Sequence, residues 1–170
     1  MIEIREATRA DVPEIARVHV MADWDTYAPL FGAGAHALDI GDCEHRWWQA
    51  LRDGGLLLLA TDAGAIVGLG HAYADRIDAL YLLAAYHRRG IGKAMLARML
   101  QALHRCGIAE ARFDVVAVNA RAIAFYVAQG ARPVGRCINT DPRGDTEDLI
   151  FAIATAPLAP KVAAGLAYEA

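Results

Sequence analysis

The sequence predicts one domain of the α+β or mixed α/β class with a single central sheet. Alternating or wholly apolar segments, such as Ile2 to Glu6 and Leu56 to Thr61, are typical of strands, and segments of helical period separate them. At 170 residues the chain is long enough for one substantial core and too short for two domains. Because neither a repeat nor a linker is visible, residues 1–154 are assigned to the domain and residues 155–170 to a C-terminal tail or arm.

Composition and charge argue against several classes of protein. Apolar residues make up 56% of the chain, but no run approaches the roughly 20 that a membrane-spanning helix needs. The first residues lack the basic and then apolar plan of a signal peptide. A net charge of −3 offers no basic footprint for nucleic acid. Cys43, Cys106 and Cys137 are odd in number and lack metal-ligand spacing, so we expect reduced thiols, no metal and a cytoplasmic protein.

The first half of the chain is predicted to hold two helices and four strands. Thr8 to Pro13 opens the first helix, whose apolar residues lie three to four apart and predict one buried face. The residues of that face are Val12, Ile15, Val18 and His19. A second helix covers Asp42 to Arg52, and we expect its Trp47 and Trp48 to pack between helices. The strands are Ile2 to Glu6, Leu56 to Thr61, Ile66 to Tyr73 and Ile77 to Leu83, with glycine-containing or tight turns between the last three.

The second half is predicted to hold two helices and three strands. A helix begins at the glycines near residue 90 and stops at Gly107, because its apolar residues recur with helical period. These residues are Ile91, Met95, Leu96, Met99, Leu100 and Leu103. The remaining elements are the strand Ala111 to Val118, the helix Ala120 to Gln129, and the strands Arg132 to Ile138 and Asp148 to Ala154.

The segment from Tyr86 to Lys93 has the composition of an anion-binding turn. Gly90 and Gly92 lack Cβ atoms, so the backbone can come within hydrogen-bonding distance of an anion. The first turn of the following helix offers N–H groups without helical partners and the positive end of the helix dipole. Because Arg88, Arg89 and Lys93 add positive charge, this junction is predicted to hold a pyrophosphate.

Two familiar phosphate loops do not fit this junction. A Walker loop needs a glycine in place of His87 and Ser or Thr in place of Ala94. A dinucleotide fingerprint needs a glycine or alanine in place of Met95. The segment His87-Arg-Arg-Gly-Ile-Gly92 instead resembles the acetyl-coenzyme A loop of the GNAT N-acetyltransferase superfamily. The family pattern is Arg or Gln, two residues, Gly, one residue, then Gly or Ala, and His87 is the one departure from it.

A second segment carries the same resemblance. Asn119, Ala122, Phe125 and Tyr126 match the family's Asn-x-x-Ala-x-x-Phe-Tyr pattern, and Asn119 is also a good N-cap. Both motifs stand in the family's order and spacing, and the likeness runs from Ile2 to about Ala154. It implies the GNAT fold, which has a mostly antiparallel twisted sheet of six to seven strands and about four helices. It also implies acetyl-CoA as co-substrate.

The resemblance further implies roles for individual residues. The strand before the glycine turn is expected to splay from its neighbour, so that the pantetheine arm pairs with the exposed backbone. The amide of Leu82 would then meet the thioester oxygen, and Tyr126 would protonate the departing sulfur. The implied cofactor-binding residues are Leu82, Leu83, His87, Arg88, Arg89, Gly90, Ile91, Gly92, Lys93, Asn119, Ala122, Phe125 and Tyr126.

The general base has several candidates. Asp78 lies on the cofactor-binding strand, and His71 and Tyr73 share a face of the adjoining strand if alternation holds. Asp78 or His71 would take the proton from the amine directly or through water, and ordered water alone is a third route. The plain alternatives are that Asp78 ends a hairpin and that His71 is a satisfied, half-buried histidine.

The acceptor site is expected to lie under the segment after the first helix. By resemblance, Trp24 and Tyr27 form an apolar or cation–π wall, and Asp23 or Asp25 attracts an ammonium group. The alternative for Trp24 is packing between helices. The same likeness makes Pro29 to Gly34 a flexible loop that closes over substrate.

Two segments near the C-terminus are read from composition. Asp141 to Asp148 is an acidic hairpin loop, for which a solvated turn is the default interpretation. The tail is either a disordered end or an arm that packs on a second subunit of a homodimer.

The leading hypothesis is an acetyl-CoA-dependent N-acetyltransferase that acts on a primary amine of a small molecule or peptide by direct attack. No nucleic-acid or membrane partner is expected. Two alternatives stay open at this point. One is a non-catalytic acyl-CoA-binding regulatory module, and the other is an acyltransferase that uses another acyl chain or an alcohol acceptor.

Overall fold

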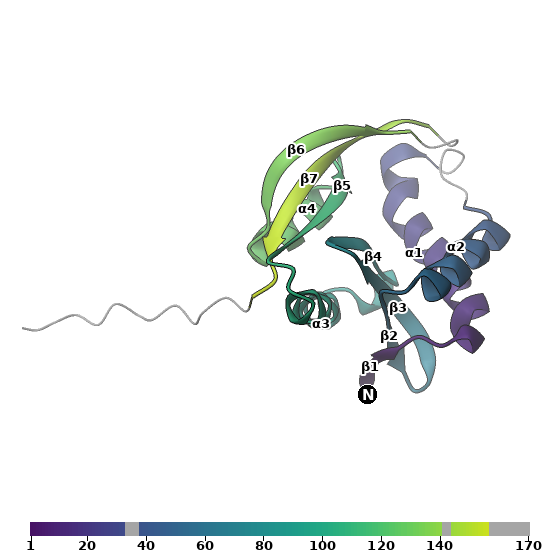
Figure 1. Cartoon of the computed structure of the whole chain (residues 1–170). Helices are drawn as coiled ribbons and strands as arrows, with labels where there is room; N and C mark the ends of the chain where they lie inside the picture. Colours follow the sequence, from purple (N-terminus) through teal and green to yellow (C-terminus); the bar gives the residue numbers. More distant parts are fainter. Residues whose placement is uncertain (33–37, 141–143, 157–170) are drawn as a thin grey trace, which may run out of the picture.

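The computed structural model of the protein describes residues 1–32, 38–140 and 144–156. Within these residues, seven strands form one sheet in the order β1-β2-β3-β4-β5-β7-β6 (Figure 1). The strands are β1 (Ile2–Glu6), β2 (Leu56–Asp62), β3 (Ala65–Tyr73), β4 (Arg76–Leu82), β5 (Glu110–Val116), β6 (Arg132–Asn139) and β7 (Thr146–Ala154). The helices are η1 (Arg9–Asp11), α1 (Val12–Phe31), α2 (Ile40–Asp53), η2 (Ala84–Tyr86), α3 (Ile91–Arg105) and α4 (Ala120–Ala128). The predicted fold class is therefore confirmed.

Strand β2 is apolar throughout because both of its faces are buried. Leu57 and Leu59 pack with α1 and α2 on one side of the sheet. Leu58 and Ala60 point the other way and join a second core with α3. Figure 1 shows α1 and α2 on the opposite side of this part of the sheet from α3. Burial on two faces replaces the polar and apolar alternation of a half-exposed strand.

The sheet is divided between β4 and β5. All other neighbouring strands are antiparallel, whereas β4 and β5 run parallel and are in register at only one position, Arg76 with Arg112. At that end the Arg112 N–H donates to the Asp75 carbonyl at 2.9 Å. Beyond it the two strands separate, as Figure 1 shows. The expected splay of the strand before the glycine turn is present.

Helix α1 is longer than the sequence suggested. The loop expected from Pro29 to Gly34 is wrong in its first part, because α1 continues to Phe31 and ends at Gly32, which has φ of +86°. Pro29 lies in the last turn, where its missing N–H removes only one helical hydrogen bond. The Gly32 N–H still donates to the Ala28 carbonyl at 2.9 Å. The rest of the expected loop, residues 33–34, lies outside the described residues.

The two tryptophans of α2 differ. Trp47 is completely buried and its Nε1–H donates to His19 Nδ1 at 3.3 Å. Trp48 is 44% exposed, so the expectation that it packs between helices is wrong. Neighbouring residues of a helix point about 100° apart, and only the Trp47 side of α2 meets α1.

None of the described helices is long and apolar enough to cross a membrane. Most of the predicted C-terminal tail lies outside the described residues.

Candidate active site

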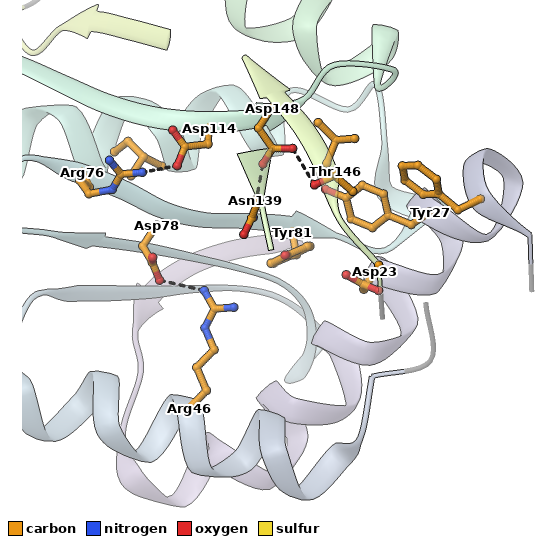
Figure 2. A pocket seen from close by; sticks show the side chains of 14 residues that line it. Asp23, Tyr27, Arg46, Arg76, Asp78, Tyr81, Asp114, Asn139, Thr146 and Asp148 are labelled. Carbon is orange, nitrogen blue, oxygen red and sulfur yellow. Dashed lines mark hydrogen bonds and ion pairs between the residues drawn. The ribbon is translucent and has the colours of Figure 1, made fainter. Parts of the chain in front are cut away.

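A cavity of about 300 Å³ lies where β4 and β5 separate. Helix α1 contributes Asp23 and Tyr27 to its wall, β4 contributes Tyr81, and β7 contributes Thr146 and Asp148 (Figure 2). Asp23 and Tyr27 reach the cavity together because residues four apart lie on the same face of a helix. The cavity therefore joins three parts of the chain that are far apart in sequence.

Two ion pairs between arginine and aspartate line this cavity. The Arg46 guanidinium donates to Asp78 Oδ2 at 2.9 Å, and the Arg76 guanidinium donates to Asp114 Oδ2 at 2.5 Å. Asp78 Oδ2 also lies 3.2 Å from His71 Nδ1. The hydrogen bond from His71 and the charge of Arg46 hold the pKa of Asp78 well below its usual range. A carboxylate with a lowered pKa is a weak proton acceptor.

Asp148 brings a third carboxylate to the wall. Its side chain is buried, with 3% of the residue exposed. The Thr146 hydroxyl donates to one carboxylate oxygen at 2.9 Å, and the Asn139 amide donates to the other at 3.4 Å. Both donors are neutral.

Two tyrosines near the cavity have raised pKa values. Burial raises the pKa of Tyr81 and of Tyr126, and the nearby Tyr27 raises both further. The Tyr81 ring lies 4.4 Å from the His19 ring, and the Tyr126 ring lies 4.3 Å from the Phe113 ring. Both phenols stay protonated in neutral solution, which makes them proton donors rather than acceptors.

The backbone of Leu82 faces the gap between β4 and β5. The Leu83 N–H donates to the Val67 carbonyl at 3.0 Å, while Leu82 stands opposite Gly68. In an antiparallel pair, alternate residues turn their N–H and C=O groups toward the partner strand and away from it. The N–H and C=O of Leu82 therefore point away from β3, into the gap.

His87 already forms a hydrogen bond with one of these two backbone groups. Its Nε2 lies 2.8 Å from the Leu82 carbonyl oxygen, and its Nδ1 lies 3.2 Å from the Arg121 guanidinium. A carbonyl only accepts and a guanidinium only donates, so Nε2 carries the proton and Nδ1 accepts. The residue that departs from the family pattern thus contacts the strand end and α4.

The glycine turn has the geometry of an anion cradle. Gly90 has φ of +80° and precedes α3, whose first helical bond runs from the Ala94 N–H to the Gly90 carbonyl at 3.0 Å. The N–H groups of Ile91, Gly92 and Lys93 come before that bond and lie at the positive end of the helix dipole. A Cβ added to Gly92 would meet only the Phe125 ring, at 3.6 Å. The residues present therefore fit a pyrophosphate.

The second motif is packed against the first. The Asn119 side chain accepts the Ala122 N–H at 3.1 Å, so its predicted N-cap role is confirmed. Phe125 lies under Gly92, and the rings of Phe125 and Tyr126 meet at 5.0 Å. The structure thus brings together the two segments that carry the sequence resemblance.

The sequence profile of the Acetyltransferase (GNAT) family matches residues 18–131, more than half of the chain. The chain belongs to the GNAT acetyltransferase family. It is 27% identical over 139 residues to the uncharacterized N-acetyltransferase YuaI of Bacillus subtilis, covering 75% of this chain and 79% of that protein.

Solved structures of GNAT proteins share the fold. The GCN5-related N-acetyltransferase from Rhodopseudomonas palustris matches with a TM-score of 0.78 and 21% identity, over 89% of this chain and 94% of that one. The acetyltransferase yncA from Salmonella typhimurium, solved with its cofactor acetyl-CoA, matches with a TM-score of 0.70 and 17% identity, over 96% and 99% of the two chains.

Three residues expected at the acceptor site of this GNAT protein lie elsewhere. Trp24 is 43% exposed and is absent from the cavity wall, as is Tyr73, which lies at the end of β3. His71 is buried behind Asp78, and its Nε2 faces Gly55, where a Cβ would come within 3.2 Å. Their proposed contacts with substrate stay predictions, and the described cavity does not include them.

Several residues of the cavity were missed from the sequence. Arg46, Arg76, Asp114 and Asn139 gave no local signal, because their partners lie on other elements. Asp148 was placed both at the end of the solvated acidic loop and at the start of the last strand. The strand assignment is right and the solvated-loop interpretation is wrong for this residue, because β7 begins at Thr146 and Asp148 is buried. Asp141 to Arg143 of that loop lie outside the described residues. Across the described ranges, no three metal-ligating side chains are grouped.

Proposed function

We propose that this GNAT protein transfers the acetyl group of acetyl-CoA to a primary amine by direct attack. The observation that carries the proposal is the backbone of Leu82, whose N–H and C=O face the gap between β4 and β5. The glycine turn follows Leu82 in the chain, and Tyr81, the residue before Leu82, lines the cavity. A donor and an acceptor would therefore meet at one strand end.

The donor half would be held by backbone groups and by α4. The N–H groups at the start of α3 and the cations Arg88 and Lys93 suit a pyrophosphate. The Leu82 backbone suits the amide groups of a pantetheine arm, which would pair with it as a strand does. When bound, acetyl-CoA supplies the activated thioester carbon.

Two groups of the chain would lower the barrier. The Leu82 N–H would donate to the oxygen on which negative charge develops, and loss of one such donor commonly costs about 3 kcal/mol of transition-state stabilisation. Tyr126, protonated because burial raises its pKa, would donate to the departing sulfur. We infer that the ammonium proton of the acceptor passes to water, because Asp78 is held as a weak base by Arg46 and His71.

The relatives support this proposal in outline. One relative is described as an N-acetyltransferase, and the solved yncA structure contains acetyl-CoA. The cytoplasmic location expected from the cysteines belongs to the same proposal.

The direct test is to mix the protein with acetyl-CoA and a panel of amines. Release of free thiol is followed by absorbance, and mass spectrometry identifies the acetylated amine. A reaction without amine measures hydrolysis. The proposal predicts amine-dependent thiol release and a binding isotherm for acetyl-CoA by calorimetry. If acetyl-CoA does not bind at high protein concentration, the proposal is refuted.

A further inference from the structure

The cavity carries an excess of negative charge. Its described lining contains four aspartates, Asp23, Asp78, Asp114 and Asp148, and two arginines, Arg46 and Arg76. Each arginine is already paired with one aspartate, Arg46 with Asp78 and Arg76 with Asp114. The described lining therefore holds more carboxylates than cations. A carboxylate on a substrate would meet repulsion here, because an aspartate already balances the charge of each arginine.

Asp148 is a buried carboxylate of this lining whose hydrogen-bond donors among the described residues are neutral. It is 3% exposed, and Figure 2 shows it reaching toward the cavity from β7. Its contacts among the described residues are the neutral donors of Thr146 and Asn139. Among the residues that the structure describes, no arginine, lysine or histidine forms an ion pair with Asp148. Burial of a carboxylate without a cation is unfavourable, and a bound ammonium would offset that cost.

The wall next to Asp148 suits an alkyl chain. Tyr27 and Phe31 come from α1 and Tyr81 comes from β4, and all three line the cavity. Aromatic faces pack against methylene groups and attract cations. Tyr81 directly precedes Leu82 in β4, so the aromatic wall and the expected thioester position share one strand end.

The size of the cavity favours a small ligand. Its volume of about 300 Å³ is at the lower end of the roughly 300 to 1,000 Å³ that is usual for small-molecule sites. A linear amine with a second cationic group would fill it and match its charge. An uncharged tail would leave Asp148 desolvated without a cation.

We propose that the acceptor is a small linear diamine or polyamine and that Asp148 is the residue that selects its second cation. One amino group would react beside Leu82, while the other would be held by the Asp148 carboxylate. This inference rests on the proposed acetyl transfer. It adds the substrate class and a specificity residue.

The test compares amines that share one butyl chain and differ only at the far end. Putrescine ends in an ammonium group, aminobutanol in a hydroxyl, butylamine in a methyl and aminobutyrate in a carboxylate. With saturating acetyl-CoA, we expect kcat/KM for putrescine to exceed that for butylamine by about tenfold or more, because a charge-assisted hydrogen bond is lost with the methyl end. Aminobutyrate should be the slowest.

Asp148→Asn removes the charge and keeps the shape. The ratio of kcat/KM for putrescine to that for butylamine should fall by about fivefold or more, mainly through a higher KM for putrescine. Glu147→Gln is the matched control, since it removes the carboxylate of the preceding residue of β7. The Glu147 carboxylate pairs with Arg136 outside the cavity. That control should keep the ratio. Thermal unfolding and acetyl-CoA calorimetry show whether each variant is folded.

The outcomes separate this inference from the proposed function. Acetylation of butylamine as fast as putrescine by the unaltered protein would overturn the inference and leave acetyl transfer standing, and this comparison does not depend on any variant. If no amine is acetylated, the binding of each amine is measured by calorimetry on protein loaded with coenzyme A. Tighter binding of putrescine than butylamine, lost in Asp148→Asn, would support the ligand class while acetyl transfer fails. Equal binding of the two amines would overturn the inference.

Discussion

His87 donates its Nε2–H to the carbonyl oxygen of Leu82 across 2.8 Å. This contact occupies a backbone group that faces the gap where a pantetheine arm would pair. A cofactor that used the Leu82 carbonyl would first have to displace the imidazole. The histidine would therefore compete with such a ligand for one hydrogen bond.

Replacement of His87 by alanine should tighten acetyl-CoA binding. A net hydrogen bond is worth about 1 kcal/mol, so its removal from the free protein should lower Kd by about fivefold. Isothermal calorimetry on both proteins measures the change. Weaker binding in the variant would mean that His87 is itself a cofactor contact, as the family resemblance implies.

Gly92→Ala should impair acetyl-CoA binding without harming the fold. The added Cβ would lie 3.6 Å from Phe125, an ordinary contact, and alanine is favoured over glycine in a helix by about 1 kcal/mol. The Tm should therefore stay the same or rise, while Kd for acetyl-CoA rises by about tenfold or more. Gly135→Ala in β6 is the control, because its Cβ would lie 3.5 Å from Ile150, far from the turn in sequence. Unchanged binding in Gly92→Ala would show that the ligand does not approach this backbone.

Tyr126→Phe should lower kcat by about a hundredfold and change KM much less, because the hydroxyl acts on the departing sulfur. Burial raises the pKa of Tyr126 above the ordinary tyrosine value of about 10. The acid form therefore persists, and kcat should show no fall from loss of this proton up to about pH 10. Steady-state thiol release across pH provides the measurement. A descending limb near neutrality that vanishes in the variant would contradict this assignment.

Asp78→Asn should reduce kcat/KM by less than about tenfold. Its carboxylate has a lowered pKa, owing to the hydrogen bond from His71 and the charge of Arg46, and is a poor base. The rise of rate with pH should then follow the substrate ammonium in both proteins. A loss of about a thousandfold together with a changed acid limb would instead identify Asp78 as the general base.

Asp11 should contribute to stability in a pH-dependent way. Its carboxylate receives both terminal nitrogens of Arg5, at 2.6 and 2.9 Å, and the Thr8 backbone N–H at 2.8 Å. The hydrogen bond from Arg5 holds the pKa of Asp11 well below its usual range. A carboxylate whose pKa is lower in the folded than in the unfolded protein stabilises the fold at pH values above its unfolded pKa of about 4. This stabilisation is lost as the pH falls below that value.

Asp11→Asn should lower the free energy of unfolding by about 1 to 2 kcal/mol at neutral pH. The difference from the unaltered protein should shrink at about pH 3, because the unfolded aspartate is then mostly protonated. Urea unfolding at both pH values tests this. Glu14→Gln serves as control, since its pair with Arg17 is exposed and should be worth less than about 1 kcal/mol. A difference that does not change with pH would refute the assignment.

The glycine turn and the start of α4 were predictable because local sequence specifies them. Gly90 and Gly92 set the backbone of one turn, and Asn119 caps the helix that it begins. Such features depend on residues within one turn of each other. The strands and helices were likewise found from their apolar periods, although α1 runs on to Phe31 through the segment that was expected to follow it.

The cavity between β4 and β5 was less predictable because tertiary contacts assemble it. Asp148 looked like part of a polar loop, and only its pairing with β5 and β6 buries it. Trp24 was expected beside Tyr27 in the wall, with Asp23 or Asp25 attracting the ammonium, yet the helical period places Asp23 beside Tyr27 and turns Trp24 outward. A register shift in the pairing of β3 with β4 after His71 added a local irregularity that alternation could not reveal.

In the proposed function, different groups of the chain recognise the donor and the acceptor. Backbone groups of β4 and the glycine turn would make the donor contacts, and most side-chain changes would leave those backbone groups intact. The cavity wall is made instead of charged side chains from α1, α2, β4, β5 and β7. If the protein acetylates amines as proposed, exchange of a few of those side chains would redirect it to a different amine while acetyl-CoA binding stayed the same.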